Sequence, residues 1–208
     1  MKTITRKITV TGILIALSLA MGFTVGYLPI SIGPLQITLM HIPVIVGTIM
    51  EGLVPGLILG LVFGFTSMMQ LFMGSPFIAV FNVSPVFILM IIFIPRLLIP
   101  VFTWLVNKAI TGKSTSYPRH GIAAGVAALT GSLTNTVFFL GMMYFLVGGI
   151  LTQIPQIAAI GVMAFITGTA LVNGLPEAAA AVLLTVPIVL ALKRAYKSRF
   201  MLVKPSEA

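Results

Sequence analysis

Residues 82–106 read NVSPVFILMIIFIPRLLIPVFTWLV, and this stretch decides the fold. It is long and apolar enough to cross a lipid bilayer, yet it holds Arg96 near its middle. Of the twelve Lys and Arg residues in the chain, the other eleven lie outside the apolar stretches. A guanidinium keeps its proton, and a charge at the bilayer centre costs about 3 kcal/mol on insertion scales. We therefore expect Arg96 to face a polar partner, a cavity or an anion rather than lipid.

Two interpretations of Arg96 stay open, and they are compatible. It can pair with Glu177, the acidic residue inside another apolar stretch, or it can contact a ligand directly. Pro95 and Pro100 flank it, and because proline has no N–H, each leaves free a backbone carbonyl one turn upstream. Polar backbone atoms are therefore expected around this arginine.

The composition excludes a soluble domain. Of the 208 residues, 59 % are hydrophobic and 7 % are charged, so there are too few polar side chains to cover a soluble fold. We expect an integral protein of the cell membrane with a single domain over residues 1–208. The net charge of +9 lies in short basic clusters beside apolar spans, which indicates membrane topology and not nucleic-acid binding. Since the chain contains no cysteine, disulfides and thiolate chemistry are excluded.

The apolar runs predict an all-α membrane protein, a bundle of six transmembrane helices with apolar outer loops. The pairs Glu51-Gly52 and Pro55-Gly56 form a turn signal that separates the second helix from the third. The apolar residues 150–166 are interpreted as an outer loop with an interfacial helix that starts near Pro155. The expected spans are 8–28, 36–50, 53–73, 84–107, 121–147 and 167–192.

The distribution of charge predicts the orientation of these spans. Three basic residues precede the first span, three lie in 108–119, and five follow the sixth. The segments 29–38, 74–83 and 148–166 contain no Lys, Arg, Asp or Glu. Because basic residues collect on the cytoplasmic side, we expect both termini to be cytoplasmic and the three uncharged segments to lie outside.

Polar residues in two further spans, the fifth and the sixth, fall at a depth similar to that of Arg96. Asn173 and Glu177 are four residues apart and share a helix face. The buried amide of Asn135 needs a partner, which is either another helix or a ligand. The uncharged outer segments either close over a ligand or rest on the membrane surface. The predicted substrate-binding residues are Arg96, Asn135, Asn173, Glu177, Thr134, Asn82 and Gln36.

Small residues recur every fourth position in the first span. Gly12, Ala16 and Ala20 fall on one helix face, where small side chains let another backbone approach closely. This face either packs inside the bundle or docks another membrane protein.

No arrangement of residues predicts catalysis or metal binding. His41 and His120 lie on opposite sides of the membrane in the expected topology, and no His/Glu pair has metal-ligand spacing. TGKST at 111–115 resembles the end of a phosphate-binding loop but lacks its first glycine, since Asn107 stands there, and lacks the preceding strand. We expect neither an enzyme nor a cofactor in this chain.

Three segments carry a resemblance to a known family. They are TLMHIPVIVGTIMEGLVPGLILGLVFGFTS at 38–67, GSLTNTVFFLG at 131–141 and NGLPEAAAAVLLTVPIV at 173–189. Together with Ala16 and Ala20, they resemble the substrate-binding S components of energy-coupling factor (ECF) vitamin transporters, over nearly the whole chain. The resemblance implies a six-helix bundle that captures a vitamin on the outer side. It also implies partners: a transmembrane coupling subunit of the EcfT type, which docks at Ala16 and Ala20, and two cytoplasmic ATPases of the EcfA type, which use ATP.

The segments are most similar to the pantothenate-specific branch of that family. A guanidinium such as Arg96 binds a small carboxylate in bidentate fashion, which suits pantothenate. Folate also carries carboxylates, so it remains an alternative, whereas the thiamine cation fits poorly. Two other functions stay open: a stand-alone transporter coupled to protons through Glu177, and a structural membrane subunit without a ligand.

Overall fold

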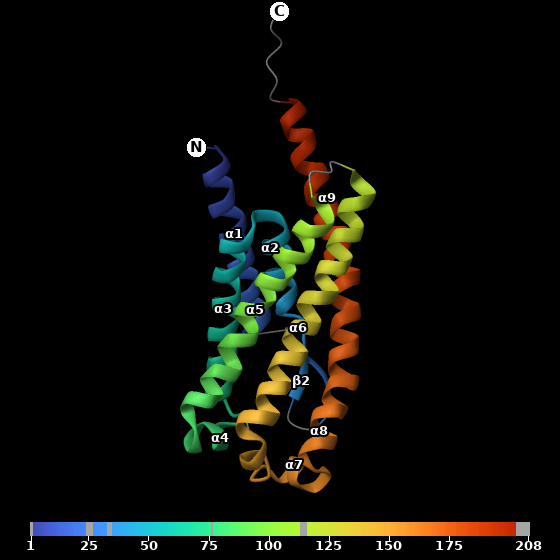
Figure 1. Cartoon of the computed structure of the whole chain (residues 1–208). Coiled ribbons are helices and arrows are strands. Elements are labelled where there is room, and N and C mark those ends of the chain that lie inside the picture. The colour runs from blue at the N-terminus through green and yellow to red at the C-terminus, as the bar shows by residue number, and fades with distance from the viewer. Residues whose placement is uncertain (1, 24–26, 33–34, 76, 113–115, 203–208) are drawn as a thin grey trace, which may run out of the picture.

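Five helical runs in the described part of the chain are long and apolar enough to cross a membrane. The computed structural model describes residues 2–23, 27–32, 35–75, 77–112 and 116–202, with side chains for 4–23, 38–75, 77–112, 116 and 118–196. The long helices are packed side by side as a bundle (Figure 1), which confirms the helical membrane fold. The five are α1 (Lys2–Phe23), α3 (Leu53–Phe72), α5 (Pro85–Thr111), α6 (Tyr117–Leu151) and the run of α8 (Val162–Thr169), η1 (Ala170–Gly174) and α9 (Leu175–Leu202).

The predicted second span is only partly a helix. Strands β1 (Tyr27–Ile32) and β2 (Leu35–Thr38) form an antiparallel hairpin, and the helix α2 (His41–Glu51) follows it. The helix expected over 36–50 is therefore wrong at its start, because β-favouring residues there pair with a second strand. The 11 residues of α2 rise about 16 Å, roughly half of the hydrocarbon core. Almost all of α2 is buried, so it lies inside the bundle and does not face lipid.

The other outer segments contain short helices. Helix α4 (Ile78–Val83) lies in the segment that was expected to be a loop, and α7 (Pro155–Ile160) begins at the predicted proline. Gly161 has a φ of +85°, which favours glycine and lets α7 end and α8 begin at once. The last span therefore starts at Val162 and not at 167 as predicted.

The start of α1 and the end of α9 lie at the same end of the bundle, and α4 and α7 lie at the opposite end (Figure 1). This arrangement agrees with six passages, in which the hairpin and α2 together make the second. The side of the membrane on which the termini lie remains a prediction.

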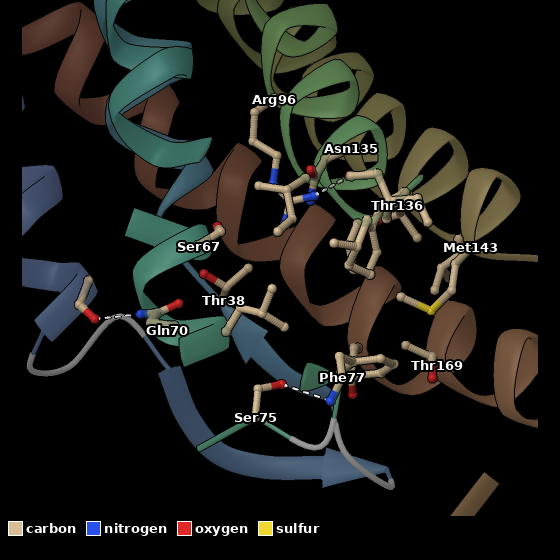
Figure 2. A pocket seen from close by; sticks show the side chains of 18 of the residues that line it. Thr38, Ser67, Gln70, Ser75, Phe77, Arg96, Asn135, Thr136, Met143 and Thr169 are labelled. Carbon is tan, nitrogen blue, oxygen red and sulfur yellow. Dashed lines mark hydrogen bonds between the residues drawn. The ribbon is translucent and has the colours of Figure 1, made fainter. Parts of the chain in front are cut away.

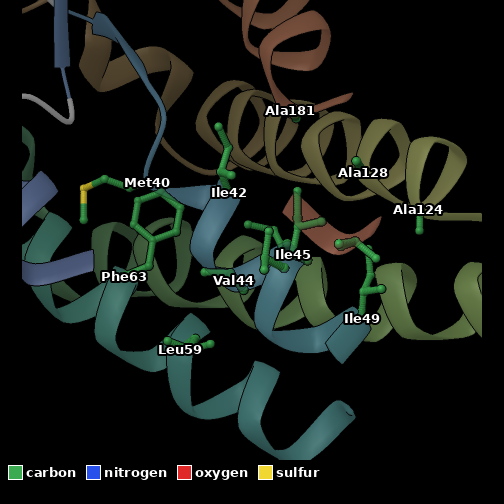
Figure 3. Packing of buried hydrophobic residues seen from close by; sticks show 14 residues of the cluster. Met40, Ile42, Val44, Ile45, Ile49, Leu59, Phe63, Ala124, Ala128 and Ala181 are labelled. Atoms are coloured by element: carbon green, nitrogen blue, oxygen red, sulfur yellow. The ribbon is translucent and has the colours of Figure 1, made fainter. Parts of the chain in front are cut away.

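Two apolar clusters fill the described bundle. In the half near the termini, Ile42, Ile45 and Ile49 of α2 point toward alanines of α6 and α9 (Figure 3). The small side chains, among them Ala124 and Ala128, let α2 sit close to α6. The second cluster lies in the other half, around the inner faces of α5 and α6 and the short helices, and several of its members also line a cavity.

Candidate functional site

A cavity of about 470 Å³ lies in the half of the bundle away from the termini. Its volume falls within the range of about 300–1,000 Å³ that small-molecule sites occupy. Polar and apolar side chains share its wall, and Figure 2 shows 18 of its residues. The polar lining residues are Thr38, Ser67, Gln70, Ser75, Arg96, Asn135, Thr136, Thr169, Asn173 and Glu177. The apolar ones include Leu71, Phe77, Ile88, Ile91, Ile92, Phe139, Leu140 and Met143.

Arg96 lines this cavity from α5 and is 7 % exposed. Its guanidinium carbon lies 4.5 Å from the ring centroid of Phe139 and 5.0 Å from that of Phe63. Aromatic faces attract a cation, and they do so more strongly in a desolvated site. The charge is thus held within the protein at the cavity wall, as the sequence predicted, and not against lipid.

The two prolines of α5 leave two backbone carbonyls near this arginine without their usual helical donor. Pro95 cannot donate to the carbonyl of Ile91, and Nη1 of Arg96 donates to that oxygen at 3.2 Å. Pro100 likewise cannot donate to the carbonyl of Arg96 itself, and that oxygen faces Gly60 of α3. The helix continues through both positions from Pro85 to Thr111. One of the two carbonyls that the prolines leave free therefore accepts a hydrogen bond from the arginine side chain.

A row of glycines on α3 brings α5 close. A Cβ atom added at Gly60 would lie 2.6 Å from the carbonyl oxygen of Arg96. At Gly64 it would lie 2.7 Å from Cδ1 of Phe93, and at Gly56 it would lie 2.8 Å from Cβ of Pro100. Real Cβ atoms do not approach so closely, so these positions require glycine at the present spacing of α3 and α5.

Glu177, in the first turn of α9, lines the same cavity and is 5 % exposed. Its Oε1 accepts a hydrogen bond of 2.6 Å from the backbone N–H of Thr38, at the end of β2. Glu177 and Arg96 do not form a salt bridge with each other. The salt bridge found among the described residues joins Arg6 to Glu51, at 3.5 Å. The carboxylate therefore anchors the hairpin and also faces the cavity.

Three buried polar atoms of the lining have no hydrogen-bond partner among the described residues. They are Oδ1 of Asn135, Oγ of Ser67 and Oγ1 of Thr169. A buried polar atom without a partner is costly, and such atoms mark places where a ligand or water binds. The lining thus offers an amide oxygen and two hydroxyl groups beside the guanidinium.

A π-helix aligns the polar residues of the last span. Thr169, Asn173 and Glu177 follow one another at four-residue spacing, and all three line the cavity. The intervening η1 winds with i→i+5 hydrogen bonds, so residues four apart drift less around the axis than in an α-helix. Gly174 lets this segment approach α6, since a Cβ there would lie 2.8 Å from Cγ2 of Thr136.

The structure brings together four of the predicted site residues, Arg96, Asn135, Asn173 and Glu177. Thr134 lies outside the lining, and its hydroxyl donates to the carbonyl of Thr130 at 2.7 Å. Asn82 is exposed on α4 and also lies outside the lining. For Gln36, the backbone belongs to β2 but the side chain lies outside the described residues.

Sequence reasoning missed several lining residues. Ser67 and Gln70 are three residues apart on α3, a spacing that places them on one face. Gln70 lines the cavity and donates from Nε2 to the carbonyl of Gly22 at 2.6 Å. Thr169 continues the four-residue spacing of Asn173 and Glu177, a signal that was available in the sequence.

The predicted docking face is uncovered in this chain. Gly12, Ala16 and Ala20 are exposed on α1, and a Cβ at Gly12 would meet nothing within 4 Å. In an 18-residue window of α1, 11 % of the residues are buried, against 28 to 44 % in the other four runs. Among the described residues, the small-residue face of α1 therefore does not pack inside the bundle.

Among the described residues, no three His, Cys, Asp or Glu side chains gather. His41 is buried at the start of α2, and His120 lies within 2.9 Å of the Lys193 ammonium, Nδ1 to Nζ, near the termini.

Comparison with known proteins agrees with the architecture. The family model of the ECF transporter, substrate-specific component, matches residues 6–189. The pantothenic acid transporter PanT of Lactococcus lactis subsp. cremoris (strain MG1363) is 32 % identical over 196 residues, which cover 88 % of this chain and 90 % of that protein. The family match spans most of the chain, including all the helices that line the cavity. The chain therefore belongs to the family of substrate-specific components of ECF transporters, which are membrane transport subunits without catalytic activity or a cofactor of their own.

Proposed function

We propose that this chain captures pantothenate for an ECF-type importer. The observation that carries the proposal is a buried guanidinium at the wall of a small-molecule cavity, with an amide and hydroxyl groups beside it. Pantothenate offers a carboxylate at one end, and an amide and hydroxyl groups along the rest of the molecule. The name of the Lactococcus relative supports the same vitamin.

The proposed binding mode assigns a role to four polar side chains of the lining. Arg96 holds the carboxylate through two parallel N–H···O bonds, which a planar guanidinium favours. Asn135 and Asn173 bond the amide and the hydroxyls, and Glu177 accepts from a hydroxyl. The apolar lining excludes water, which strengthens each of these bonds. The hairpin and the segment around α4 act as lids.

The proposed partners are a transmembrane coupling subunit of the EcfT type and two cytoplasmic ATPases of the EcfA type. Membership in the family supports them, because a substrate-specific component supplies no hydrolysis itself. The exposed face at Gly12, Ala16 and Ala20 is the proposed contact with the coupling subunit.

Binding of radiolabelled pantothenate to the purified protein tests this function. We expect tight binding by the natural chain and a loss of about 100-fold or more in Arg96→Ala, because a hydrogen-bonded ion pair is removed. Arg119→Ala is the matched control, since Arg119 is an exposed arginine near the termini that donates to the carbonyl of Ile110. Folate and thiamine serve as competitors, and only unlabelled pantothenate should displace the label.

Two results would contradict the proposal. Undiminished binding in Arg96→Ala would remove the role of the guanidinium. Displacement of the label by folate, or no binding of pantothenate at all, would assign the cavity to another ligand.

A further inference from the structure

The carbonyl oxygen of Ile91 has one natural donor in an uninterrupted helix, the N–H of residue 95. Residue 95 is proline, so that donor is missing. The guanidinium of Arg96 reaches back along α5 and donates from Nη1 to this oxygen at 3.2 Å. The presence or absence of an N–H at residue 95 thus determines whether the Ile91 oxygen is available to the Arg96 side chain.

We propose that Pro95 is a positioning residue of the substrate site. Because it has no N–H, it leaves the Ile91 carbonyl available to accept from Arg96, and this bond orients the guanidinium toward the cavity. The inference rests on the proposed function only for the identity of the ligand. A guanidinium has five N–H donors in one plane. A hydrogen bond to one of them fixes the direction of that N–H, and together with the rings of Phe63 and Phe139 it limits how the rest of the guanidinium can turn toward a carboxylate.

The backbone of Arg96 is held independently of its side chain. Its carbonyl oxygen, which Pro100 cannot bond, lies so close to α3 that a Cβ at Gly60 would be 2.6 Å away. The aromatic rings of Phe63 and Phe139 lie 5.0 and 4.5 Å from the guanidinium carbon. The backbone contact and the rings restrict translation of the charge, while the bond to Ile91 restricts the direction in which Nη1 points.

An alanine at position 95 would restore the N–H, which would compete for the Ile91 oxygen. The helix itself would gain a hydrogen bond, so the variant should fold at least as well. The expected damage is confined to the direction of the guanidinium. Carboxylate recognition should therefore suffer while the rest of the site remains intact.

The test compares pantothenate with pantothenol, in which a primary alcohol replaces the carboxylate. In Pro95→Ala we expect about 10-fold weaker binding of pantothenate, the value of one well-placed bond to a charged group, and unchanged binding of pantothenol. In an Arg96→Gln background, Pro95→Ala should have no further effect on either ligand. Pro187→Ala is the matched control, because Pro187 also lies inside a spanning helix but is exposed and outside the lining.

A second measurement needs no ligand. In ¹⁵N-arginine spectra of the ligand-free protein in nanodiscs, the Arg96 side-chain signals are identified by their loss in Arg96→Gln. We expect them to shift in Pro95→Ala and to stay in place in Pro187→Ala. Equal weakening of both ligands, an additive effect on Arg96→Gln, or unshifted Arg96 signals would overturn the role of Pro95. Shifted signals together with no pantothenate binding in the natural chain would instead overturn the proposed function and leave the positioning role standing.

Discussion

An asparagine side chain inside a membrane bundle is costly unless a partner, which can be a ligand, bonds its amide. Asn135 is 6 % exposed, lines the cavity, and its Oδ1 has no partner among the described residues. Asn82 is exposed on α4 and does not line the cavity. Both asparagines were predicted for the site, but only Asn135 is buried at the cavity.

Asn135→Ala should weaken pantothenate binding by about 10-fold, because a bond to the ligand is lost. The melting temperature should not fall, since the amide oxygen gives up no bond to the described protein. Asn82→Ala should change neither quantity. Binding isotherms and thermal unfolding in the same detergent measure both, and equal losses of affinity in the two variants would contradict this distinction.

At the scale of elements, the contact between α3 and α5 positions the arginine. Gly56, Gly60 and Gly64 are spaced one turn apart and lie against Pro100, Arg96 and Phe93. Close backbone approach of this kind is the main source of helix association in lipid. The site therefore depends on glycines of α3 that have no side chains of their own.

Gly60→Ala should destabilise the protein by about 1–3 kcal/mol, because the added methyl must push the Arg96 carbonyl away. Affinity for pantothenate should fall as well. Gly141→Ala is the control: this glycine of α6 has nothing within 4 Å of its added Cβ. Thermal unfolding of both variants checks the prediction, and an unchanged melting temperature in Gly60→Ala would refute the close approach.

The exposed face of α1 is the second element with a proposed role. Ala16→Leu should abolish co-purification with the coupling subunit, because the larger side chain prevents close approach of a partner helix. Pantothenate binding by the isolated chain should remain. Ile13→Ala, also exposed on α1, serves as the control and should retain the partner. A complex that survives Ala16→Leu would remove α1 as the docking surface.

At the scale of the whole molecule, charge and topology are linked. Both termini lie at one end of the bundle, and the basic clusters of the sequence collect there. The end that carries α4 and α7 contains no Lys, Arg, Asp or Glu in segments 74–83 and 148–166. The positive-inside rule therefore predicts that the cavity lies in the outer half of the bundle.

Single cysteines test this orientation, since the natural chain has none. Gln153→Cys, beside α7, should react with a membrane-impermeant maleimide in intact cells. Ser116→Cys, before α6, should react only after permeabilisation. Both side chains are exposed, so access to the reagent depends on the side of the membrane. The reverse pattern would invert the topology and place the cavity on the cytoplasmic side.

The sequence by itself determined the membrane class, the long spans, the prolines beside Arg96 and four of the residues around the cavity. These follow from local properties: the length of apolar runs, the cost of charge in lipid, and helical spacing. The turn at Gly52 and the start of α7 at Pro155 are equally local, and both were predicted.

Only the tertiary structure decided the rest. The start of the predicted second helix is instead strand β2, which pairs with β1, and its last residue, Thr38, donates its N–H to the carboxylate of Glu177, 139 positions along the chain. Thr134 and Asn135 are neighbours, yet a rotation of 100° per residue puts one hydroxyl on its own helix and the other side chain into the cavity. That Gly60 faces the carbonyl of Arg96 depends on how α3 packs against α5, and no local pattern contains that information.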